Sequence, residues 1–425
     1  MNIPKTNLPR IIVIGGGFGG VAFIKRMQKE AVQIVLFDRH NYHTFQPLLY
    51  QVSSASLEPD SIAYPLRKIF RKSTDFHFRM AKVNKVDPEA KKVFSSIGEL
   101  DYDYLVIATG TRTNFFGNDN IQKFSMPMKT VPQALNIRSL ILQNIEEADI
   151  SADLNERKKN LTFVIAGGGP TGVEMAGALA EFRKSILHHD YPFIKESEME
   201  VHLIEGGDRL LSAMSETASS GALRYLNKLG VITHLNTRVN DYDGELIVTD
   251  QDLELHTKTF IWAAGVTGAP VEGINAKDLK QYGNRYKVNR FNQIEGFETI
   301  YALGDVAYME TEKFPKGHPM VAQPAIQQGK HLAENFKRLL RNKKRKEFEY
   351  RDKGSMATVG RNKAVVDMKR TSYTGAFAWF VWMFVHLWFL IGFRNRVVTF
   401  FNWSYNYINY DRAARLIIRP FKRLD

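Results

Sequence analysis

The chain has 425 residues, a net charge of +13 at pH 7 and no cysteine. Its length is sufficient for two or three domains with cores of their own, and a hydrophobic content of 44% argues against disorder along the whole chain. The absence of thiols excludes disulfide bonds, cysteine-ligated metal or iron–sulfur centres and cysteine nucleophiles.

The first predicted elements are a strand, a glycine-rich turn and a helix. An apolar run at 11–14 predicts a buried strand, and a second strand at 34–37 ends at Asp38. Such a turn can hold a pyrophosphate on the amides of a helix N-terminus, and the acid can bind a ribose hydroxyl. The turn consists of Gly15, Gly16, Gly17, Phe18, Gly19 and Gly20.

Further elements separate this turn from a second one. Residues 104–107 predict another buried strand, which leads into Thr109 and Gly110. A polar helical stretch follows at about 130–158.

The second glycine-rich turn follows an apolar strand at 163–166. The next strand, at 201–204, ends at Glu205, and residues 259–265 repeat the strand-to-glycine pattern of 105–110. The chain therefore contains an internal duplication of a nucleotide-binding fold. The glycines of the second turn are Gly167, Gly168, Gly169 and Gly172.

The acid of the second unit favours one nicotinamide nucleotide. A carboxylate at Glu205 accepts hydrogen bonds from a free ribose diol and repels a 2′-phosphate, which favours NADH over NADPH. Arg209 lies close by in the sequence and leaves NADPH open. The late position of Glu205 after its turn predicts a longer helix or loop around 188–198.

A short strand and a helix follow the duplicated units. Residues 299–305 predict a strand that runs into Asp305, and a helix with Pro324 in its first turn is predicted within 320–340. Gln323 and Gln327 are four residues apart, so they share one face of this helix. Their amides could bind ring carbonyl groups, and a polar solvent-facing surface is the alternative.

The positive charge is concentrated in two clusters. Residues 337–346 form the first cluster, and the tail from Arg394 forms the second. Nucleic acid, an anionic membrane surface and a merely solvated surface are the alternatives that such clusters leave open. The segment between them favours the membrane, and we expect no nucleic-acid partner.

That segment, residues 375–393, has no formal charge and is rich in aromatic residues. Tryptophan prefers the headgroup boundary, and His386 would be costly in hydrocarbon. We therefore expect one or two helices in the membrane interface, including an apolar piece at 397–410 and a basic amphipathic end at 412–422. A spanning helix and a buried homodimer interface remain alternatives.

With these motifs in place, the chain resembles the type II NADH:quinone oxidoreductases. Residues 322–327 (AQPAIQ) are similar to the family's AQxAxQ quinone motif, and 167–174 (GGGPTGVE) is the second specific mark. Residues 45–51 (FQPLLYQ) resemble the family's loop beside the flavin. One departure is Asp38, where a longer glutamate is common.

The resemblance implies an α/β fold of two Rossmann-like, glutathione-reductase-like domains with a C-terminal membrane-associating helical segment. We expect a discontinuous FAD-binding domain at 1–125 and 270–345 and an NADH-binding domain at 126–269. Residues 346–425 would anchor the chain to the membrane and support dimerisation.

The resemblance also implies site residues. FAD would bind at the first glycine-rich turn and NADH at the second, with Glu205 on the NADH ribose. Glu174 would lie near nicotinamide and quinone and act in catalysis with Gln323 and Gln327, while Lys363 would lie near the quinone channel. The other implied FAD contacts are Asp38, Arg39, Thr109, Gly110, Asp305, Ala322 and Gln323.

The implied reaction is hydride transfer from NADH to FAD N5 and then two-electron reduction of menaquinone or ubiquinone, without proton pumping. The polar N-terminus carries no signal peptide, so we expect the catalytic body on the cytoplasmic side of the inner membrane. A soluble reductase of a ferredoxin-like partner and a non-enzymatic NADH sensor are the alternatives. Sulfide:quinone oxidoreductases and disulfide reductases need redox cysteines, which this chain lacks.

Overall fold

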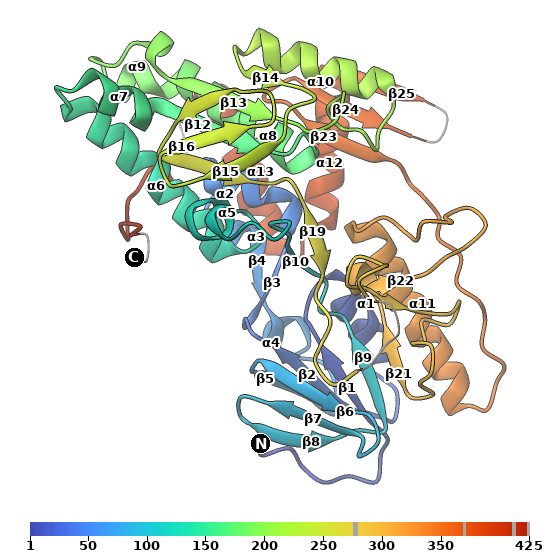
Figure 1. Cartoon of the computed structure of the whole chain (residues 1–425). Helices are drawn as coiled ribbons and strands as arrows, with labels where there is room; N and C mark the ends of the chain where they lie inside the picture. Colours follow the sequence, from blue (N-terminus) through green and yellow to red (C-terminus); the bar gives the residue numbers. More distant parts are fainter. Residues whose placement is uncertain (275–278, 369–370, 410–413, 423–425) are drawn as a thin grey trace. The chain divides into compact units, whose positions relative to one another are not determined.

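The computed structural model describes residues 1–274, 279–368, 371–409 and 414–422, and they fall into two compact units (Figure 1). The first unit comprises 1–43, 64–112 and 266–352, and the second comprises 44–63, 113–265 and 353–425. Residues 44–63 and the C-terminal region thus cluster with the second unit.

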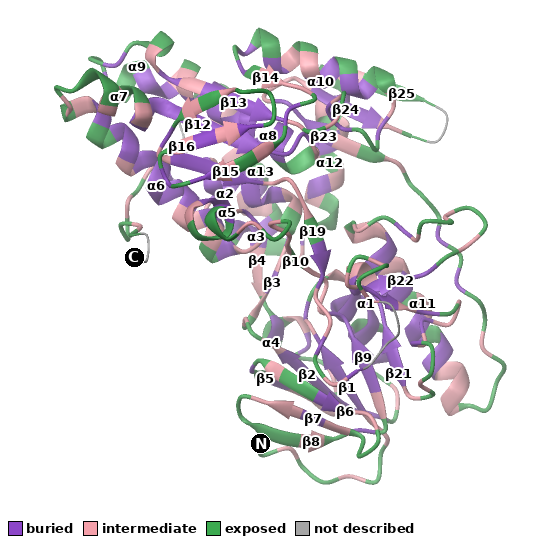
Figure 2. Ribbon diagram, in the orientation of Figure 1, coloured by how far each residue is buried: buried purple, intermediate pink, exposed green. Residues whose placement is uncertain are grey.

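A five-stranded parallel sheet forms the centre of the first unit. Its central strands are apolar on both faces because helices and loops cover both sides, and Figure 2 shows them as buried. In spatial order they are β21 (Ile300–Ala302), β9 (Tyr104–Ile107), β1 (Arg10–Ile14), β2 (Gln33–Asp38) and β5 (Phe76–Met80).

Two helices of the first unit pack closely against each other. They are α1 (Phe18–Met27) and α11 (Ala322–Leu340). A Cβ atom at Gly329 of α11 would lie 2.4 Å from the carbonyl oxygen of Gly19, so the helices meet backbone to backbone at this point. Pro324 lies in the first turn of α11, as predicted.

The second unit contains a parallel sheet of the same kind. In spatial order its strands are β11 (Met126–Pro127), β18 (Thr259–Trp262), β12 (Thr162–Ala166), β13 (Glu200–Ile204) and β14 (Ile232–His234). The predicted duplication is therefore confirmed: in each sheet, the strand before the glycine turn pairs with the strand that ends in the acid.

Helices of the second unit differ in detail from the prediction. The expected helical stretch at 130–158 consists of α6 (Val131–Ile150) and α7 (Leu154–Leu161), because Asp153 caps a new helix. The glycine turn opens α8 (Pro170–Phe182), which continues into a π-helical turn at Arg183–Leu187. This extension accounts for the predicted long segment before β13.

The C-terminal part of the second unit is a small sheet followed by two helices. The antiparallel sheet has the strands β23 (Ser355–Thr358), β24 (Ala364–Asp367) and β25 (Ser372–Gly375). The helices are α12 (Ala376–Phe389) and α13 (Phe393–Asn409).

The two C-terminal helices correct one alternative for the aromatic tail. Among the described residues, no helix is long and apolar enough to cross a membrane. The 14 residues of α12 extend for about 21 Å, which is shorter than a hydrocarbon core of about 30 Å. Of the predicted basic end at 412–422, residues 412–413 lie outside the described residues, and 414–422 contain no helix.

Side-chain amides and an indole attach α13 to the segment 44–63. Asn395 Nδ2 donates to the carbonyl oxygens of Asp60, Ser61 and Ala63 at 2.9 to 3.2 Å. Trp403 Nε1 donates to Gln51 Oε1 at 2.8 Å. The C-terminal helix therefore forms part of the second unit's packing.

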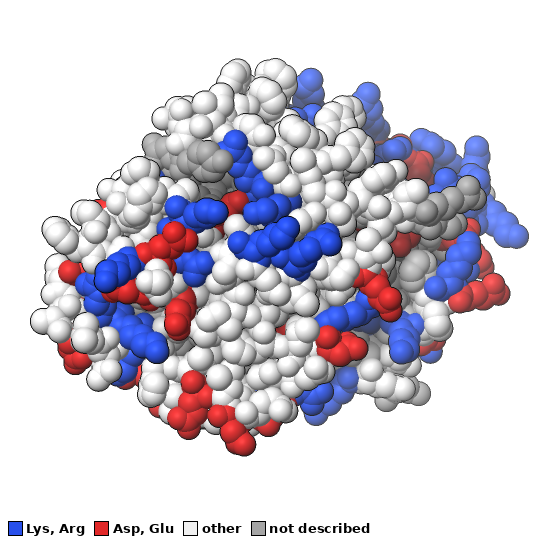
Figure 3. Space-filling model, turned by 90° about the horizontal axis from the view of Figure 1, so that it is seen from above, with Lys and Arg blue, Asp and Glu red and all other residues white. Residues whose placement is uncertain are grey.

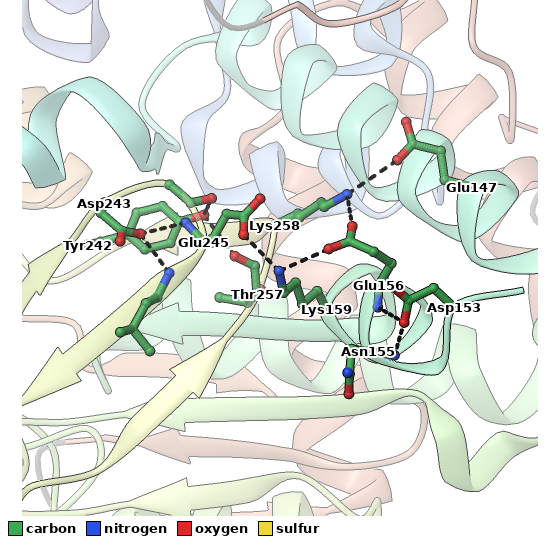
Figure 4. A network of polar contacts seen from close by, with 12 residues as sticks. Glu147, Asp153, Asn155, Glu156, Lys159, Tyr242, Asp243, Glu245, Thr257 and Lys258 are labelled. Carbon is green, nitrogen blue, oxygen red and sulfur yellow. Dashed lines mark hydrogen bonds and ion pairs between the residues drawn. The ribbon is translucent and has the colours of Figure 1, made fainter. Parts of the chain in front are cut away.

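A network of ion pairs joins Glu147, Glu156, Lys159, Glu245 and Lys258 in the second unit (Figure 4). Lys159 pairs with Glu156 and Glu245, and Lys258 pairs with Glu156 and Glu147, at 2.7 to 4.0 Å. Both lysines lie just before the first residues of β12 and β18, so the network is at the amino ends of these strands, away from the carboxyl ends at which ligands bind.

Candidate functional site

The carboxyl ends of four strands meet at one edge of the first sheet. Ile14 pairs with Phe37 and Ile107, and Ala302 pairs with Ile107, so these strands end side by side. The glycine turn, Asp38, Thr109 and Asp305 all follow at this edge, where ligands bind in open α/β sheets.

The first turn accepts only glycine at its crowded positions. Gly15 has φ of +106°, and a Cβ atom there would lie 2.3 Å from the carbonyl oxygen of Ala108. A Cβ atom at Gly20 would lie 2.0 Å from the carbonyl oxygen of Gly15.

The N-terminus of α1 is open by comparison. The N-cap is Gly17, and no described residue lies within 4 Å of its Cβ position or caps the helix with a side chain. Uncapped amides at a helix N-terminus beside open space fit the pyrophosphate of a dinucleotide such as FAD.

Asp38 is oriented by backbone amides at this turn. Its Oδ2 accepts from Gly16 N at 2.6 Å, and its Oδ1 accepts from His40 N at 2.8 Å. Each carboxylate oxygen has a second lone pair, so the group can also accept from ribose hydroxyls. Arg39, the neighbouring predicted contact, is exposed.

The remaining predicted FAD contacts lie at the same edge. Thr109 Oγ1 donates to the carbonyl oxygen of Ala269 at 2.7 Å, and Gly110 O accepts from Ala269 N at 3.0 Å. Gly304 N donates to Gln328 Oε1 at 2.7 Å, which joins the turn of Asp305 to α11. Ala325, near the start of α11, also lies beside this turn, since a Cβ atom at Gly304 would be 3.1 Å from its Cβ.

The two predicted quinone-site glutamines are in different surroundings. Gln327 Nε2 donates to Arg351 O at 2.9 Å, and Arg351 N donates to Gln327 Oε1 at 3.1 Å. The amide of Gln327 thus pairs with the main chain in both directions. Gln323 is half-buried in the first turn of α11.

The second turn repeats the geometry of the first. Gly167 has φ of +110°, and its Cβ position lies 2.6 Å from the main chain at Ala263. A Cβ atom at Gly172 would lie 1.9 Å from the carbonyl oxygen of Gly167. The N-cap of α8 is Gly169, and no described residue lies within 4 Å of its Cβ position.

Glu205 takes the place that Asp38 has in the first unit. Its Oε2 accepts from Gly168 N at 2.5 Å, and its Oε1 accepts from Gly207 N at 2.7 Å. Arg209 donates from Nη2 to Ser212 O at 2.8 Å. Glu205 therefore forms hydrogen bonds with the main chain of the turn, whereas Arg209 bonds to Ser212.

Glu174 is a buried carboxyl group in the interior of α8. Glu174 is only 7% exposed, and Thr358 N donates to its Oε1 at 3.4 Å. Burial raises its pKa well above the usual value, although the amide of Thr358 and the indole of Trp382 oppose the shift. The carboxyl group thus retains a proton into a higher pH range than an exposed glutamate.

The turn of Lys363 lies close to Glu174 through Thr358. Thr358 Oγ1 donates to the carbonyl oxygens of Gly360 and Lys363 at 3.0 and 3.2 Å. The structure therefore brings the Lys363 turn and Glu174 together in the second unit, whereas Gln323 and Gln327 belong to the first unit.

Sequence reasoning missed an aromatic cluster beside Glu174. His386 Nδ1 donates to Trp382 O at 2.7 Å, and the two rings stack with centroids 4.2 Å apart. The His386 ring also meets Phe45 edge to face at 6.0 Å. The signal was the four-residue spacing of Trp382 and His386, which puts both on one helix face.

Comparisons with known proteins agree on one family. The model for pyridine nucleotide-disulphide oxidoreductases matches residues 9–329, and the NDH2 C-terminal domain matches 353–409. A type II NADH:quinone oxidoreductase of Mycobacterium tuberculosis is 33% identical over 96% of this chain and 89% of its own length. A protein of the same name from Staphylococcus saprophyticus is 28% identical over 84% of this chain and 89% of its own length.

Solved structures show the same fold. NDH2 from Plasmodium falciparum in complex with NADH has a TM-score of 0.88 at 22% identity, covering 97% of this chain and 100% of that one. The sulfide:quinone oxidoreductase of Aquifex aeolicus has a TM-score of 0.69 at 20% identity, covering 91% and 92%.

Proposed function

We infer, from the fact that the chain belongs to the type II NADH:quinone oxidoreductase family, that it oxidises NADH and reduces a membrane quinone by means of bound FAD. The observation that carries this function is the repeated site: two uncapped glycine turns, each bordered by a carboxylate at the end of the neighbouring strand. The absence of cysteine separates the chain from thiol-dependent relatives with the same fold.

The first turn is proposed to hold FAD and the second NADH. Thr109, Gly110, Asp305 and α11 lie at the same end of the first sheet as this turn. They extend the surface on which a long cofactor can bind. At the second turn, Glu205 favours the free ribose of NADH and disfavours a 2′-phosphate. FAD, when bound, supplies the two-electron redox chemistry that no side chain of this protein can supply.

Glu174 is proposed to hold and deliver a proton during quinone reduction. The group is buried, and its raised pKa keeps it protonated in a range where an exposed glutamate is ionised. Gln323 is proposed to contact the quinone. Gln327 is proposed to act in the same region by orienting the main chain at Arg351, since both ends of its amide are engaged there.

The C-terminal helices are proposed to lie on the membrane surface. Large aromatic side chains on α12 and α13 are exposed, and tryptophan and other aromatic side chains favour the boundary between headgroups and hydrocarbon. We propose that this surface binds the cytoplasmic side of the inner membrane. The alternative is that the same helices form a homodimer interface. The exposed aromatic residues are Phe377, Phe380, Phe384, Trp388, Phe389, Phe393, Phe400, Phe401 and Tyr405.

The exposed aromatic side chains, and not the charge pattern, favour a lipid partner over nucleic acid. On the face drawn in Figure 3, a run of Lys and Arg side chains crosses the middle of the view, with acidic side chains and uncharged surface around it. A basic run of this kind fits either an anionic membrane surface or nucleic acid.

The activity is tested by steady-state oxidation of NADH with the purified, FAD-loaded protein. Menaquinone and ubiquinone analogues serve as acceptors, and NADPH replaces NADH as the control. We expect quinone-dependent oxidation of NADH and a much slower reaction with NADPH. A protein that reduces a ferredoxin-like acceptor and neither quinone would support the soluble-reductase alternative instead.

A further inference from the structure

The middle glycine of the first turn, Gly16, is held through both its N–H and its carbonyl oxygen. The N–H of Gly16 donates to Asp38 Oδ2 at 2.6 Å. The carbonyl oxygen of Gly16 lies 2.9 Å from Nδ1 of His43. His43 is 2% exposed, and the ring of Phe18 packs against it edge to face with centroids 5.1 Å apart. The sequence motif includes Asp38 but offers no reason to single out His43.

The hydrogen bond determines the tautomer of His43. A carbonyl oxygen can only accept, so Nδ1 must carry the proton and Nε2 must present a lone pair. Nε2 is buried and has no hydrogen-bond partner among the described residues. Burial, with a smaller contribution from Lys25, lowers the pKa of His43 to about 4 against the opposing bond to Gly16. The imidazole is therefore a neutral donor at physiological pH.

The second turn uses the main chain for the same purpose. The N–H of Gly168 donates to Glu205 at 2.5 Å, and the carbonyl oxygen of Gly168 accepts from Leu211 N at 2.8 Å. Both turns therefore restrain the middle glycine from the acid side and from the carbonyl side. In the first turn alone, the carbonyl restraint comes from a side chain and can be removed by substitution.

Planarity of the peptide bond gives this restraint a consequence for ligand binding. The C=O of Gly16 and the N–H of Gly17 belong to one rigid peptide plane and point in opposite directions. A donor that fixes the carbonyl of Gly16 therefore fixes the direction of the N–H of Gly17. Gly17 is the N-cap of α1, the position with open space around it.

We propose that His43 is a positioning residue for the FAD pyrophosphate, which it serves by holding the Gly16–Gly17 peptide plane. The proposal rests on the assignment of FAD to the first turn. His43 need not touch the pyrophosphate. Its effect is to present the Gly17 amide in the binding direction before the cofactor arrives, and this lowers the entropy lost on binding.

Two substitutions separate the hydrogen bond from packing. His43→Phe keeps most of the ring volume and removes the donor, whereas His43→Asn loses volume and keeps an N–H close to the position of Nδ1. If packing alone matters, the Asn variant should be the weaker binder. If the hydrogen bond matters, the Phe variant should be weaker, because it leaves a buried carbonyl without a donor.

The measurement is titration of the apoprotein with FAD, followed by flavin fluorescence, together with the melting temperature of each apoprotein. We expect the dissociation constant to rise about tenfold or more for His43→Phe. For His43→Asn we expect a value close to wild type. His202→Phe is the control, because His202 is a buried histidine of the second unit. Its loss should lower the melting temperature without weakening the binding of FAD.

The outcomes also separate this inference from the proposed function. Wild-type affinity for FAD in His43→Phe, or an equal loss in both His43 variants, would overturn the role of His43 and leave the proposed function intact. A wild-type apoprotein that does not bind FAD would overturn both.

Discussion

At the scale of single residues, the environment of Glu174 differs from that of a surface carboxylate. Burial within α8 raises its pKa, so the folded chain binds a proton that the unfolded chain releases above the ordinary pKa of 4.5. The contribution of Glu174 to the free energy of unfolding therefore becomes less favourable as pH rises from 4.5 towards the folded-state pKa.

The first prediction concerns Glu174→Gln. Glutamine resembles the protonated acid but cannot exchange a proton, so quinone reduction should slow while FAD content stays unchanged. The variant should also lose the decrease in stability with rising pH, as measured by urea unfolding across a pH series. Glu216→Gln, an exposed acid in the same unit, is the control. If Glu174→Gln reduces quinone as fast as the wild type at every pH, Glu174 does not deliver the proton.

Residues of the two turns could be predicted from the sequence because each turn is a local pattern. The glycines and acids of the turns directly follow apolar strands, and the structure places them at the strand ends. They are Gly15, Asp38, Gly167 and Glu205. Contacts that depend on tertiary packing could not be predicted. Gln327, for example, meets Arg351 only because the loop after α11 returns to the helix.

At the scale of secondary-structure elements, α13 is held by a buried amide that bridges several carbonyl groups. The second prediction is that Asn395→Ala lowers the free energy of unfolding by about 1 to 3 kcal/mol, because three acceptors lose their donor. Urea unfolding of the full chain and limited proteolysis of the C-terminal segment measure the effect. Asn409→Ala changes an exposed asparagine of the same helix and should be neutral. Equal stability of both variants would contradict the anchoring of α13.

The third prediction concerns membrane binding by the exposed aromatic face of α12. Phe384 and Trp388 are 66% and 64% exposed and line an apolar surface pocket of about 170 Å³ with their helix neighbours. Replacing both with serine should weaken binding to vesicles of anionic lipid, measured by co-sedimentation. Phe193→Ser removes an aromatic side chain that is 81% exposed elsewhere in the second unit and should leave binding unchanged. If the double variant binds vesicles normally but changes oligomeric state, the face is a dimer interface.

The sequence predicted helices in this tail but not which side faces inward. Apolar and aromatic residues occur on all sides of α12, so periodicity could not separate the buried Trp382 and His386 from the exposed Phe384 and Trp388. His386 was the one informative residue, because a histidine is unfavourable in hydrocarbon and favourable against a carbonyl group.

At the scale of the whole molecule, buried neutral histidines make the fold sensitive to acid. Burial lowers the pKa of His43, His318 and His386 to about 4 from the ordinary 6.5. The unfolded chain then binds more protons than the folded chain between these values. The fourth prediction is that the contribution of these histidines to the free energy of unfolding decreases as pH falls from about 6.5 towards about 4.

Urea unfolding at a series of pH values measures this decrease. His386→Gln should reduce the dependence on pH, whereas substitution of His188, which is exposed, should not. An equal dependence on pH in the wild type and in His386→Gln would contradict the neutral state of this buried ring.

The two Rossmann-like sheets were predictable because the chain repeats one pattern of strand, turn, helix and acid. The grouping of 44–63 with the second unit could not be predicted, since it depends on hydrogen bonds from Asn395 and Trp403, hundreds of residues later in the chain. Sequence patterns report local order, and long-range docking of this kind leaves no local signal.

The most direct test of the whole account is anaerobic stopped-flow absorbance of the FAD-loaded protein. NADH should bleach the flavin absorbance, and a subsequent mix with a menaquinone or ubiquinone analogue should restore it at a rate at least equal to steady-state turnover. A flavin that NADH bleaches but neither quinone restores, while a ferredoxin-like acceptor does, would contradict the proposed path from NADH to a membrane quinone.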